Sequence, residues 1–423
     1  MAATVPAPAA LFVPCARGVE DLLATELTAL TGTPARSGRG GAWVDGDLVT
    51  VMRINLESRL AQRVLWPLVD GPYRGEQDLY ELARRVRWSD WITAAQTLRV
   101  DVAAQRSPLR SLNFVALRVK DAVCDALRDA CGARPSVDTR NPTLPLALYL
   151  EPGHAWLYAD TSGQALFKRG WRDEAQVRRG GGAGVKGEAP LKETLAAAML
   201  AAAGWHGRAE DGALLDPCCG AGTIAIEAAQ IACGIAPGLQ RRFAFEQQLP
   251  FAPLRRTWQE MKQAAQARVH APAVPIFAGD VSFRMTDFAA RNARAAGVGD
   301  AIAFKTADAL QRPPPLPAGT LMMNPPYGER IEPKGQASRP EGPARAMREG
   351  FADDAQAGTF FAALAAHWKR HYAGWSCWCL SPEPRLPGLM RLQESRRVPL
   401  WNGAIECRLF RFDIVAGSNR TAR

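Results

Sequence analysis

The sequence lacks the features of a membrane or secreted protein. None of its apolar runs reaches 18 residues, which is about the length that a membrane-spanning helix needs. The Ala- and Pro-rich start, Met1–Ala10, has neither a basic segment nor a long apolar core, so we interpret it as a short disordered lead and not as a signal peptide. We expect a cytoplasmic protein without a membrane partner, and its 423 residues suffice for two or three domains.

Signatures of metal and P-loop sites are missing as well. The nine cysteines include no paired C-x-x-C set, and the five histidines do not cluster with them. Scattered cysteines without a secretory signal indicate buried thiols, so we predict no metal. No Gly-Lys-Ser/Thr follows the glycine loop at 217–222, which excludes a P-loop.

Positive charge is in excess. Subtracting 42 Asp and Glu from 52 Lys and Arg gives a net charge of +10, and the pI is about 9.4. This favours an acidic partner such as nucleic acid, although excess charge can also serve solubility. Basic residues are dense between Arg99 and Arg140. They either contact the phosphate backbone of a nucleic acid or form a solvated helix face.

The first 165 residues predict two small α+β regions. Residues 1–60 contain an apolar strand followed by a helix with one apolar face, and residues 61–165 continue in the same style. The expected strands are 11–13, 42–45, 97–102, 146–150 and 155–160, and the expected helices are 19–30, 48–60, 78–87 and 113–130.

A basic joint over residues 166–189 follows these regions. It contains Lys168-Arg169-Gly170-Trp171-Arg172 and then the glycine-rich, cationic stretch 178–187. Such a stretch can hold an RNA backbone or serve as a flexible linker, and both interpretations remain open.

From residue 190 onward, strands and helices alternate, which predicts a mostly parallel sheet with helices on both faces. The expected strands are 213–216, 274–280, 301–306, 320–324 and 376–381, with a last antiparallel strand at 405–415. The expected helices are 190–203, 223–233, 258–269, 283–296 and 359–372.

Polar residues follow four of these strands. Asp216 precedes a tight loop with Gly220 and Gly222, Asp280 can accept both hydroxyls of a ribose, and Asp308 can accept an adenine amine. Ligands of open α/β sheets bind at the carboxyl ends of the strands. A single Asp after a strand is more typical of a turn or N-cap, but four polar ends in order predict a nucleoside site. A dinucleotide fingerprint would need its ribose acid about 20 residues after the glycines, and Asp280 lies far beyond that.

The fourth strand ends on Asn324-Pro325-Pro326-Tyr327. The Asn324 side-chain oxygen and the Pro325 carbonyl can accept hydrogen bonds from one planar amine, while Tyr327 stacks on the ring that carries it. A proline-rich turn is the simpler interpretation. The motif resembles the amine-methylating signature of class I S-adenosylmethionine (SAM) methyltransferases.

Several further motifs extend the resemblance over nearly the whole chain. Gly18-Val-Glu-Asp-Leu-Leu, Lys168–Arg172, Leu191-Lys-Glu-Thr, Asp216-Pro-Cys-Cys-Gly-Ala-Gly-Thr223 and Asn324–Arg330 are together similar to the THUMP-containing RNA guanine-N2 methyltransferases, above all to bacterial members with one methyltransferase domain that act on 23S ribosomal RNA. The resemblance implies an α/β, Rossmann-like class I methyltransferase domain at 190–423 after a linker at 166–189. It also implies a ferredoxin-like region at 1–60 and a THUMP RNA-binding domain at 61–165.

The resemblance also implies roles for individual residues. SAM would be bound by Asp216, Gly220, Gly222, Thr223, Asp280, Asp308 and Asn324. Catalysis would involve Asn324, Pro325, Pro326 and Tyr327. RNA would be contacted by Lys168, Arg169, Trp171 and Arg172.

This chain departs from the family pattern in three places. Ser282 replaces the second acid of an Asp-x-Asp motif, and the stretches 178–187 and 332–354 are longer than expected. Some relatives carry a second methyltransferase domain, which we do not expect here because the sequence ends before such a domain could follow. Two alternatives remain: methylation of another amine, in tRNA or in an adenine or DNA, and a non-catalytic RNA-binding ribosome-assembly factor.

Overall fold

The computed structural model describes residues 6–172, 191–325 and 354–416. Pro326, Tyr327, the stretch 178–187 and residues 332–353 of the expected insertion lie outside the described residues. The chain folds into two compact units. The first unit comprises residues 1–15, 19–168 and 237–267, and the second comprises 16–18, 169–236 and 268–423.

The first unit contains a mixed eight-stranded sheet in the order β2-β3-β1-β4-β8-β7-β5-β6. Its strands are β1 (Ala9–Pro14), β2 (Arg36–Gly38), β3 (Gly41–Gly46), β4 (Leu65–Pro72), β5 (Thr97–Ala104), β6 (Ser136–Val137), β7 (Leu144–Glu151) and β8 (His154–Asp160). Its helices are α1 (Glu20–Thr31), α2 (Leu48–Glu57), α3 (Glu76–Arg84), α4 (Leu112–Cys131) and α8 (Arg255–Ala267). All pairings are antiparallel except those of β5 with β6 and β7.

Local sequence explains several of these elements. β1 alternates buried Leu11 and Val13 with less buried neighbours, as a strand with one core face does. Asp47 caps α2 by accepting a hydrogen bond from the Thr50 amide at 2.8 Å. Helix α4 begins with a similar cap at Ser111 and ends at Gly132, whose φ of 75° is left-handed.

The stretch 237–267 belongs to the first unit although the chain reaches it from within the second. Phe243, Phe245 and Trp258 form an aromatic cluster there, with ring centroids 5.0–5.7 Å apart. The Gly238 amide donates to the Leu56 carbonyl at 2.9 Å. A stretch inside the range expected for the methyltransferase domain therefore packs with the N-terminal elements, and the predicted domain boundaries remain a prediction.

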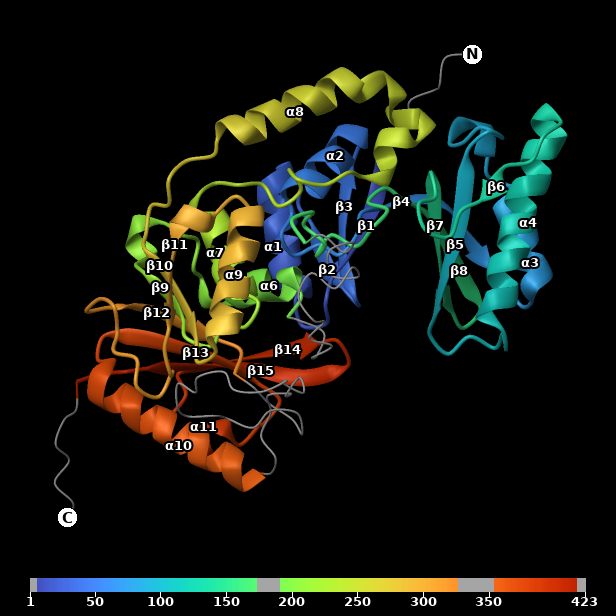
Figure 1. The fold of residues 1–423 in the computed structure, drawn as a ribbon. Coiled ribbons are helices and arrows are strands. Elements are labelled where there is room, and N and C mark those ends of the chain that lie inside the picture. Colours follow the sequence, from blue (N-terminus) through green and yellow to red (C-terminus); the bar gives the residue numbers. More distant parts are fainter. Residues whose placement is uncertain (1–5, 173–190, 326–353, 417–423) are drawn as a thin grey trace, which may run out of the picture. The chain divides into compact units, whose positions relative to one another are not determined.

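The second unit contains a seven-stranded sheet in the order β11-β10-β9-β12-β13-β15-β14 (Figure 1). Its strands are β9 (Leu214–Asp216), β10 (Ile276–Asp280), β11 (Ile302–Thr306), β12 (Gly319–Met323), β13 (Trp375–Ser381), β14 (Arg396–Asn402) and β15 (Ile405–Asp413). The pairings are parallel except for those of β15. This confirms the predicted α/β class, and the strand order reverses direction between β9 and β12.

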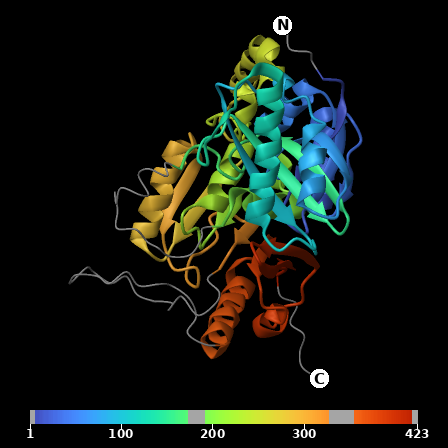
Figure 2. The same cartoon turned by 90° about the vertical axis from the view of Figure 1, so that its right-hand side faces the viewer.

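Helices cover both faces of this sheet. They are α6 (Glu193–Ala203), α7 (Thr223–Ala232), α9 (Phe283–Ala295), α10 (Asp354–His371) and α11 (Leu386–Met390). Helix α10 packs on a core that includes Leu321, Met323 and Cys377. Helix α11 lies beside α10, as Figure 2 shows in red and orange, while α7 and α9 contact β9, β10 and β11 on the other face (Figure 1).

The sequence did not indicate α11 or β14. Helix α11 is five residues long and begins with Leu-Pro, and β14 has Pro399 in its middle. A proline normally demotes a strand, but here it is tolerated because β14 is the edge strand of the sheet.

Nine free cysteines are present, most of them buried, as predicted for thiols. In the described residues, no three His, Cys, Asp or Glu side chains gather where a metal ion could bind. No helix of the described chain is long and apolar enough to cross a membrane.

Candidate functional site

The second unit brings four predicted site residues to one edge of its sheet. Asp216 and Asp280 are the last residues of β9 and β10, Asp308 follows β11, and Asn324 directly follows β12. Because these strands are parallel neighbours in the order β11-β10-β9-β12, their carboxyl ends lie in a row. The strand order reverses between Asp216 and Asn324, which is where such sheets bind ligands.

The glycine loop after β9 is tied to the neighbouring strand. The Gly220 amide donates to the Asp280 carboxylate at 3.1 Å, and the Cys219 amide donates to the Gly279 carbonyl at 2.8 Å. Gly222 precedes α7 with a φ of 85°, which only glycine adopts readily. A Cβ atom at Gly222 would lie 3.0 Å from the Ala289 Cβ atom in α9, so this glycine also permits the close approach of that helix.

Asn292 is a positioning residue that the sequence did not reveal. Its side-chain nitrogen donates from α9 to the Ala221 carbonyl at 2.9 Å. This bond holds the middle of the glycine loop against α9. An asparagine inside a helix has no spacing signature, and only the tertiary structure links it to the loop.

Burial dominates the electrostatics of Asp216. Its side chain is 1% exposed, and burial, with the Asp280 charge as a smaller cause, raises its pKa to about 8 against the hydrogen bond from the Cys218 amide. That amide bonds Oδ1 at 3.3 Å, whereas Oδ2 is buried without a hydrogen-bond partner among the described residues. A buried oxygen of this kind is suited to a cationic donor.

Asp280 is similarly buried but better bonded. Burial raises the pKa of its carboxyl, while hydrogen bonds from the Ser282 and Gly220 amides oppose the shift. Each carboxylate oxygen has two acceptor positions, so these two bonds are compatible with the predicted contacts to ribose hydroxyls. Ser282, in place of the family's second acid, contributes its amide at 3.0 Å.

Asp308 caps the turn that follows β11. Its Oδ1 atom accepts from the Leu310 amide at 2.9 Å, and its carbonyl accepts from the Arg312 amide at 2.9 Å. Asp308 therefore has the turn-capping role that is typical of an Asp after a strand. It does not use all four acceptor positions of the carboxylate, so the predicted contact with an adenine amine stays a prediction.

Asn324 presents the clearest sign of a ligand. Its Oδ1 atom is buried and lacks a hydrogen-bond partner in the described part of the chain, and Pro325 is buried beside it. Leaving a polar atom buried and unbonded is costly. A bound amine would remove that cost, as the predicted clamp requires.

The residues present fit SAM. Two buried oxygens without partners, Asp216 Oδ2 and Asn324 Oδ1, lie at the ends of the adjacent strands β9 and β12. A buried carboxylate suits the charged amino group of the methionine part, and the tight glycine loop allows backbone to approach the ligand closely. The cofactor roles of these residues and of Gly220, Gly222 and Thr223 remain predictions.

The basic motif at 168–172 is placed differently from our expectation. The guanidinium of Arg169 is 1% exposed and pairs with Glu227 at 3.0 Å, and Trp171 is buried. We therefore no longer assign Arg169 and Trp171 a direct contact with RNA, because their side chains are packed inside the second unit. Glu227, for which the sequence showed no partner, has a structural role here.

Arg172 supports the start of α7. It donates to the Thr223 hydroxyl at 2.8 Å, pairs with Glu193 at 3.0 Å and lies 4.7 Å above the Trp171 ring. Arg172 is partly exposed, as is Lys168, so RNA contacts by these two residues stay a prediction.

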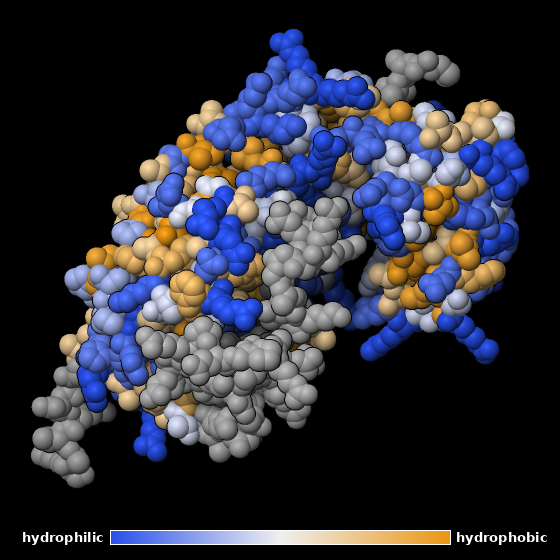
Figure 3. Space-filling model, in the orientation of Figure 1, coloured by the Kyte–Doolittle hydropathy of each residue, from blue (hydrophilic) through white to orange (hydrophobic). Residues whose placement is uncertain are grey.

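The basic region between Arg99 and Arg140 pairs partly within itself. Arg99 contacts Asp101, and Arg128 and Arg134 contact Asp125. On the face drawn in Figure 3, hydrophilic residues are interspersed with hydrophobic ones. Phe114 and Leu117 of α4 are exposed. These ion pairs favour a solvated helix face as the role of the paired arginines. Contact of the other basic residues of this region with nucleic-acid phosphates stays a prediction.

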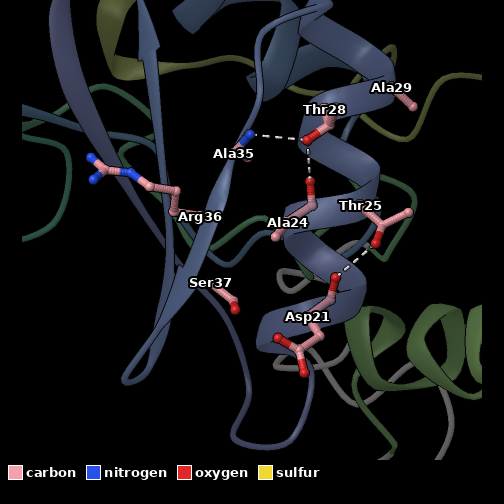
Figure 4. A pocket seen from close by; sticks show the side chains of 8 residues that line it. All are labelled: Asp21, Ala24, Thr25, Thr28, Ala29, Ala35, Arg36 and Ser37. Atoms are coloured by element: carbon pink, nitrogen blue, oxygen red, sulfur yellow. Dashed lines mark hydrogen bonds between the residues drawn. The ribbon is translucent and has the colours of Figure 1, made fainter.

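A hollow of about 810 Å³ lies elsewhere, in the first unit. Figure 4 shows that α1 and β2 line it, and none of the predicted site residues belongs to it. The hydroxyls of Thr25 and Thr28 donate to carbonyls of their own helix at 3.0 and 2.8 Å. These two hydroxyls are thus engaged within the helix, while Asp21, Arg36 and Ser37 also line the hollow.

Three family models match consecutive parts of the chain. Residues 10–65 match the RlmL ferredoxin-like domain, residues 73–160 match the THUMP domain, and residues 183–339 match the RMKL-like methyltransferase domain. The order agrees with the resemblance that the motifs indicated.

Curated relatives match over nearly the whole chain. Proteins named ribosomal RNA large subunit methyltransferase K/L are 37% identical in Syntrophotalea carbinolica and 34% identical in Aeromonas hydrophila. Each alignment covers 96% of this chain and 54% of the relative. The chain thus spans about half the length of these relatives.

Solved structures share the fold. SMU.472 in complex with S-adenosylhomocysteine (SAH) has a TM-score of 0.81 at 24% identity, with 98% of this chain and all of that chain covered. A predicted N6-adenine-specific DNA methylase from Listeria monocytogenes has a TM-score of 0.79 at 25% identity, with 96% and 97% covered. Taken together, the three matches identify an RlmL ferredoxin-like domain, a THUMP domain and an RMKL-like methyltransferase domain in this chain.

Proposed function

We propose that this protein uses SAM to methylate the exocyclic N2 amine of a guanine in large-subunit (23S) ribosomal RNA. The observation that carries the proposal is the buried, unbonded Oδ1 atom of Asn324 directly after β12. An amine that donates to this oxygen would lie at the sheet edge that also holds Asp216 and Asp280, where the cofactor is expected.

The chain's own residues would act by positioning and electrostatics. The guanine N2 lone pair is delocalised into the ring, so the amine is a poor nucleophile. Accepting hydrogen bonds at Asn324 Oδ1 and at the Pro325 carbonyl would localise that lone pair and orient it. SAM supplies an electrophilic methyl group when it is bound. The guanine must leave its stack to reach this pocket, and we assign Tyr327 the replacement of the lost stacking.

Residues at the carboxyl ends of β9, β10 and β11 would bind the cofactor. Asp216 would accept the amino group of the methionine part, Asp280 the ribose hydroxyls and Asp308 the adenine amine. The glycine loop with Gly220, Gly222 and Thr223 would close around the ligand. No metal is needed for any of these roles.

Three observations support ribosomal RNA as the substrate. The matched THUMP domain belongs to the RNA-binding region that the resemblance implies, the named relatives are ribosomal RNA methyltransferases, and the chain carries a net charge of +10. We also propose a cytoplasmic location, as such a substrate implies. Whether free RNA or a precursor particle is the partner is an outcome of the experiment below.

The test uses purified protein, tritiated SAM and separate pools of unmodified ribosomal RNA, tRNA, duplex DNA and precursor particles, with nucleoside analysis of each product. The expected result is label in N2-methylguanosine from large-subunit RNA or its particle. Label only in tRNA or in DNA would overturn the substrate but keep the amine chemistry. SAM bound without label in any pool would favour the assembly-factor alternative.

Asn324→Ala provides the matched variant for the clamp. Because the side-chain oxygen would contact the substrate amine, we expect at least a hundredfold loss of methyl transfer, in the range typical of positioned polar groups, with SAM affinity kept within about threefold. Calorimetry of SAM binding and single-turnover rates check this. Loss of SAM binding in the variant would contradict the substrate clamp and would favour the cofactor contact of Asn324 that the family resemblance implies.

A further inference from the structure

The contact between Arg172 and Thr223 leaves a buried hydroxyl hydrogen unused. Arg172 Nη2 donates to the hydroxyl oxygen of Thr223, the first residue of α7, at 2.8 Å. A guanidinium can only donate hydrogen bonds, whereas a hydroxyl has one hydrogen and two lone pairs. The Thr223 oxygen is therefore the acceptor in this contact, and its own hydrogen is left for another partner.

The described chain offers no acceptor for that hydrogen. Thr223 is 4% exposed, and its side chain makes no hydrogen bond to a described residue other than the one from Arg172. The ring of Trp171 lies 4.7 Å from Arg172 Cζ, and its buried indole N–H, which can only donate, also lacks a partner among the described residues. Buried donors without acceptors are costly, so two donors whose side chains contact one guanidinium indicate that a ligand supplies an acceptor.

Arg172 is fixed between the starts of two helices. Its Nε atom lies 3.0 Å from Oε1 of Glu193, the first residue of α6, as an ion pair without a hydrogen bond. Glu227, one turn after Thr223 in α7, pairs with Arg169 of the same basic motif at 3.0 Å. The motif at 168–172 thus connects α6 with α7 and holds the Arg172 guanidinium on the Thr223 hydroxyl.

The carboxylate of the methionine part is the acceptor that SAM can offer at this point. Thr223 follows the glycine loop that begins at Asp216, whose buried Oδ2 suits the amino group. The loop is tight, with a hydrogen bond from the Gly222 amide to the Cys219 carbonyl at 2.7 Å. Because one carbon carries both the amino group and the carboxylate, we expect their partners at the two ends of one short loop. Helix α7 has no acid in its first turn, and a helix N-terminus favours a negative charge.

We propose that Arg172 is a positioning residue that occupies a lone pair of the Thr223 oxygen and so turns the hydroxyl hydrogen toward the SAM carboxylate. Thr223 then contacts the cofactor, and Arg172 acts through Thr223. The inference rests on the proposed function, because it requires SAM at this edge of the sheet. It gives the basic motif a role in cofactor binding, in addition to the RNA contacts that the resemblance implies.

The experiment compares the affinities of SAM and decarboxylated SAM, which keeps the nucleoside, the sulfonium and the amino group but lacks the carboxylate. Calorimetry uses the full chain without RNA, so that an RNA contact cannot contribute. The variants are Thr223→Val, which removes the hydroxyl at nearly constant volume, Thr223→Ser, which keeps it, Arg172→Met, and the double variant Thr223→Val/Arg172→Met. The control is Thr286→Val in α9, which removes a buried hydroxyl whose hydrogen is already donated to the Ser282 carbonyl at 3.1 Å.

We expect Thr223→Val to bind SAM about tenfold more weakly, as the loss of a hydrogen bond to a charged group predicts, and decarboxylated SAM less than about threefold more weakly. Thr223→Ser and Thr286→Val should keep the wild-type preference for SAM over decarboxylated SAM. Arg172→Met should lose about threefold of this preference, because the hydroxyl is no longer held in one orientation. The double variant should show the same preference as Thr223→Val, because Arg172 acts only through the hydroxyl.

Equal weakening of both ligands by Thr223→Val would overturn the inference, because it would indicate a structural role only. A preference in the double variant clearly below that of Thr223→Val would also overturn it, because Arg172 would then contact the carboxylate directly. The same holds if Thr223→Ser folds normally but behaves like Thr223→Val. Failure of the wild-type protein to bind SAM at all would instead contradict the proposed function.

Discussion

At the scale of single residues, polar groups in the second unit divide into satisfied and unsatisfied ones. Arg169 and Glu227 satisfy each other inside the unit, at 3.0 Å with almost no exposure. Asp216 Oδ2 and Asn324 Oδ1 are buried without partners among the described residues. Buried polar atoms without a hydrogen-bond partner are expected at binding sites, where a bound ligand supplies the missing partner. A buried ion pair is expected to fix the positions of its two side chains.

The Arg169–Glu227 pair gives a prediction about stability. Arg169→Met would leave the buried Glu227 carboxylate without this guanidinium, which costs about 3–5 kcal/mol. The double variant Arg169→Met/Glu227→Leu should lose less than the single variant because no charge then stays buried. Urea unfolding of the full chain, followed by tryptophan fluorescence, measures the difference.

An exposed pair serves as the control for that measurement. Arg256 and Glu260 of α8 lie 2.9 Å apart, with side chains 91% and 58% exposed. Arg256→Met should change the free energy of unfolding by no more than about 0.5 kcal/mol. If the double variant at 169 and 227 proves as unstable as the single one, the uncompensated charge is not the cause.

At the scale of elements, the glycine loop between β9 and α7 connects the whole site. It accepts a hydrogen bond from Asn292 in α9, and its Cys219 and Gly220 amides donate to the end of β10. Its conformation requires a left-handed residue directly before α7. Small changes in this loop should therefore affect cofactor binding more than the same changes elsewhere.

Gly222→Ala tests this expectation against Gly204→Ala. Both glycines have a positive φ, 85° and 71°, but only Gly222 faces a close neighbour in the Ala289 Cβ atom at 3.0 Å. Each substitution should cost about 1–2 kcal/mol of stability from the left-handed backbone. Only Gly222→Ala should also weaken SAH binding, by at least about tenfold.

Unfolding and calorimetry of the two variants separate these effects. Gly204 ends α6 and has open space around it. If Gly204→Ala weakens SAH binding as much as Gly222→Ala does, general instability and not the glycine loop is responsible.

At the scale of the whole molecule, the raised pKa of Asp216 links stability to pH. Its pKa is about 8 in the folded chain against an ordinary value of 3.8, so between these values the folded state holds a proton that the unfolded state releases. The contribution of Asp216 to folding is therefore fully present below pH 4 and is lost as pH rises through 8, with a slope of at most about 1.4 kcal/mol per pH unit.

Asp216→Asn should remove this dependence. Relative to the wild-type protein, the variant should gain stability as pH rises from 4 to 8. It should bind SAH more weakly because an amide cannot pair with the ligand's ammonium group as a carboxylate can. Urea unfolding at several pH values measures the difference, with the exposed Asp300→Asn as the charge-matched control. A difference between wild type and Asp216→Asn that does not vary with pH would contradict the prediction.

The sequence by itself determined the α/β class and the order of the polar strand ends. Apolar periodicity defines strands and helices locally, and parallel strands separated by helices must align their carboxyl ends. The strands ending at Asp216, Asp280 and Met323 and the helix over Phe283–Ala295 were therefore predictable within a few residues. The motifs at Asp216–Thr223 and Asn324–Tyr327 indicated the family, which the comparisons bear out.

Only the tertiary structure decided which side chains are buried and what they contact. Arg169 and Trp171 looked like surface groups because a basic motif is typical of RNA contacts, yet both are buried, and Arg169 pairs with the distant Glu227. Residues 237–267 belong to the first unit, and the Gly238 amide donates to the Leu56 carbonyl there, although no local pattern pointed to this packing. Arg312 lies against Gly279 of β10, and its carbonyl accepts hydrogen bonds from His367 of α10 and from Tyr372. Burial and charge pairing depend on chain segments that meet only in the folded protein, whereas periodicity is local and can be read from the sequence.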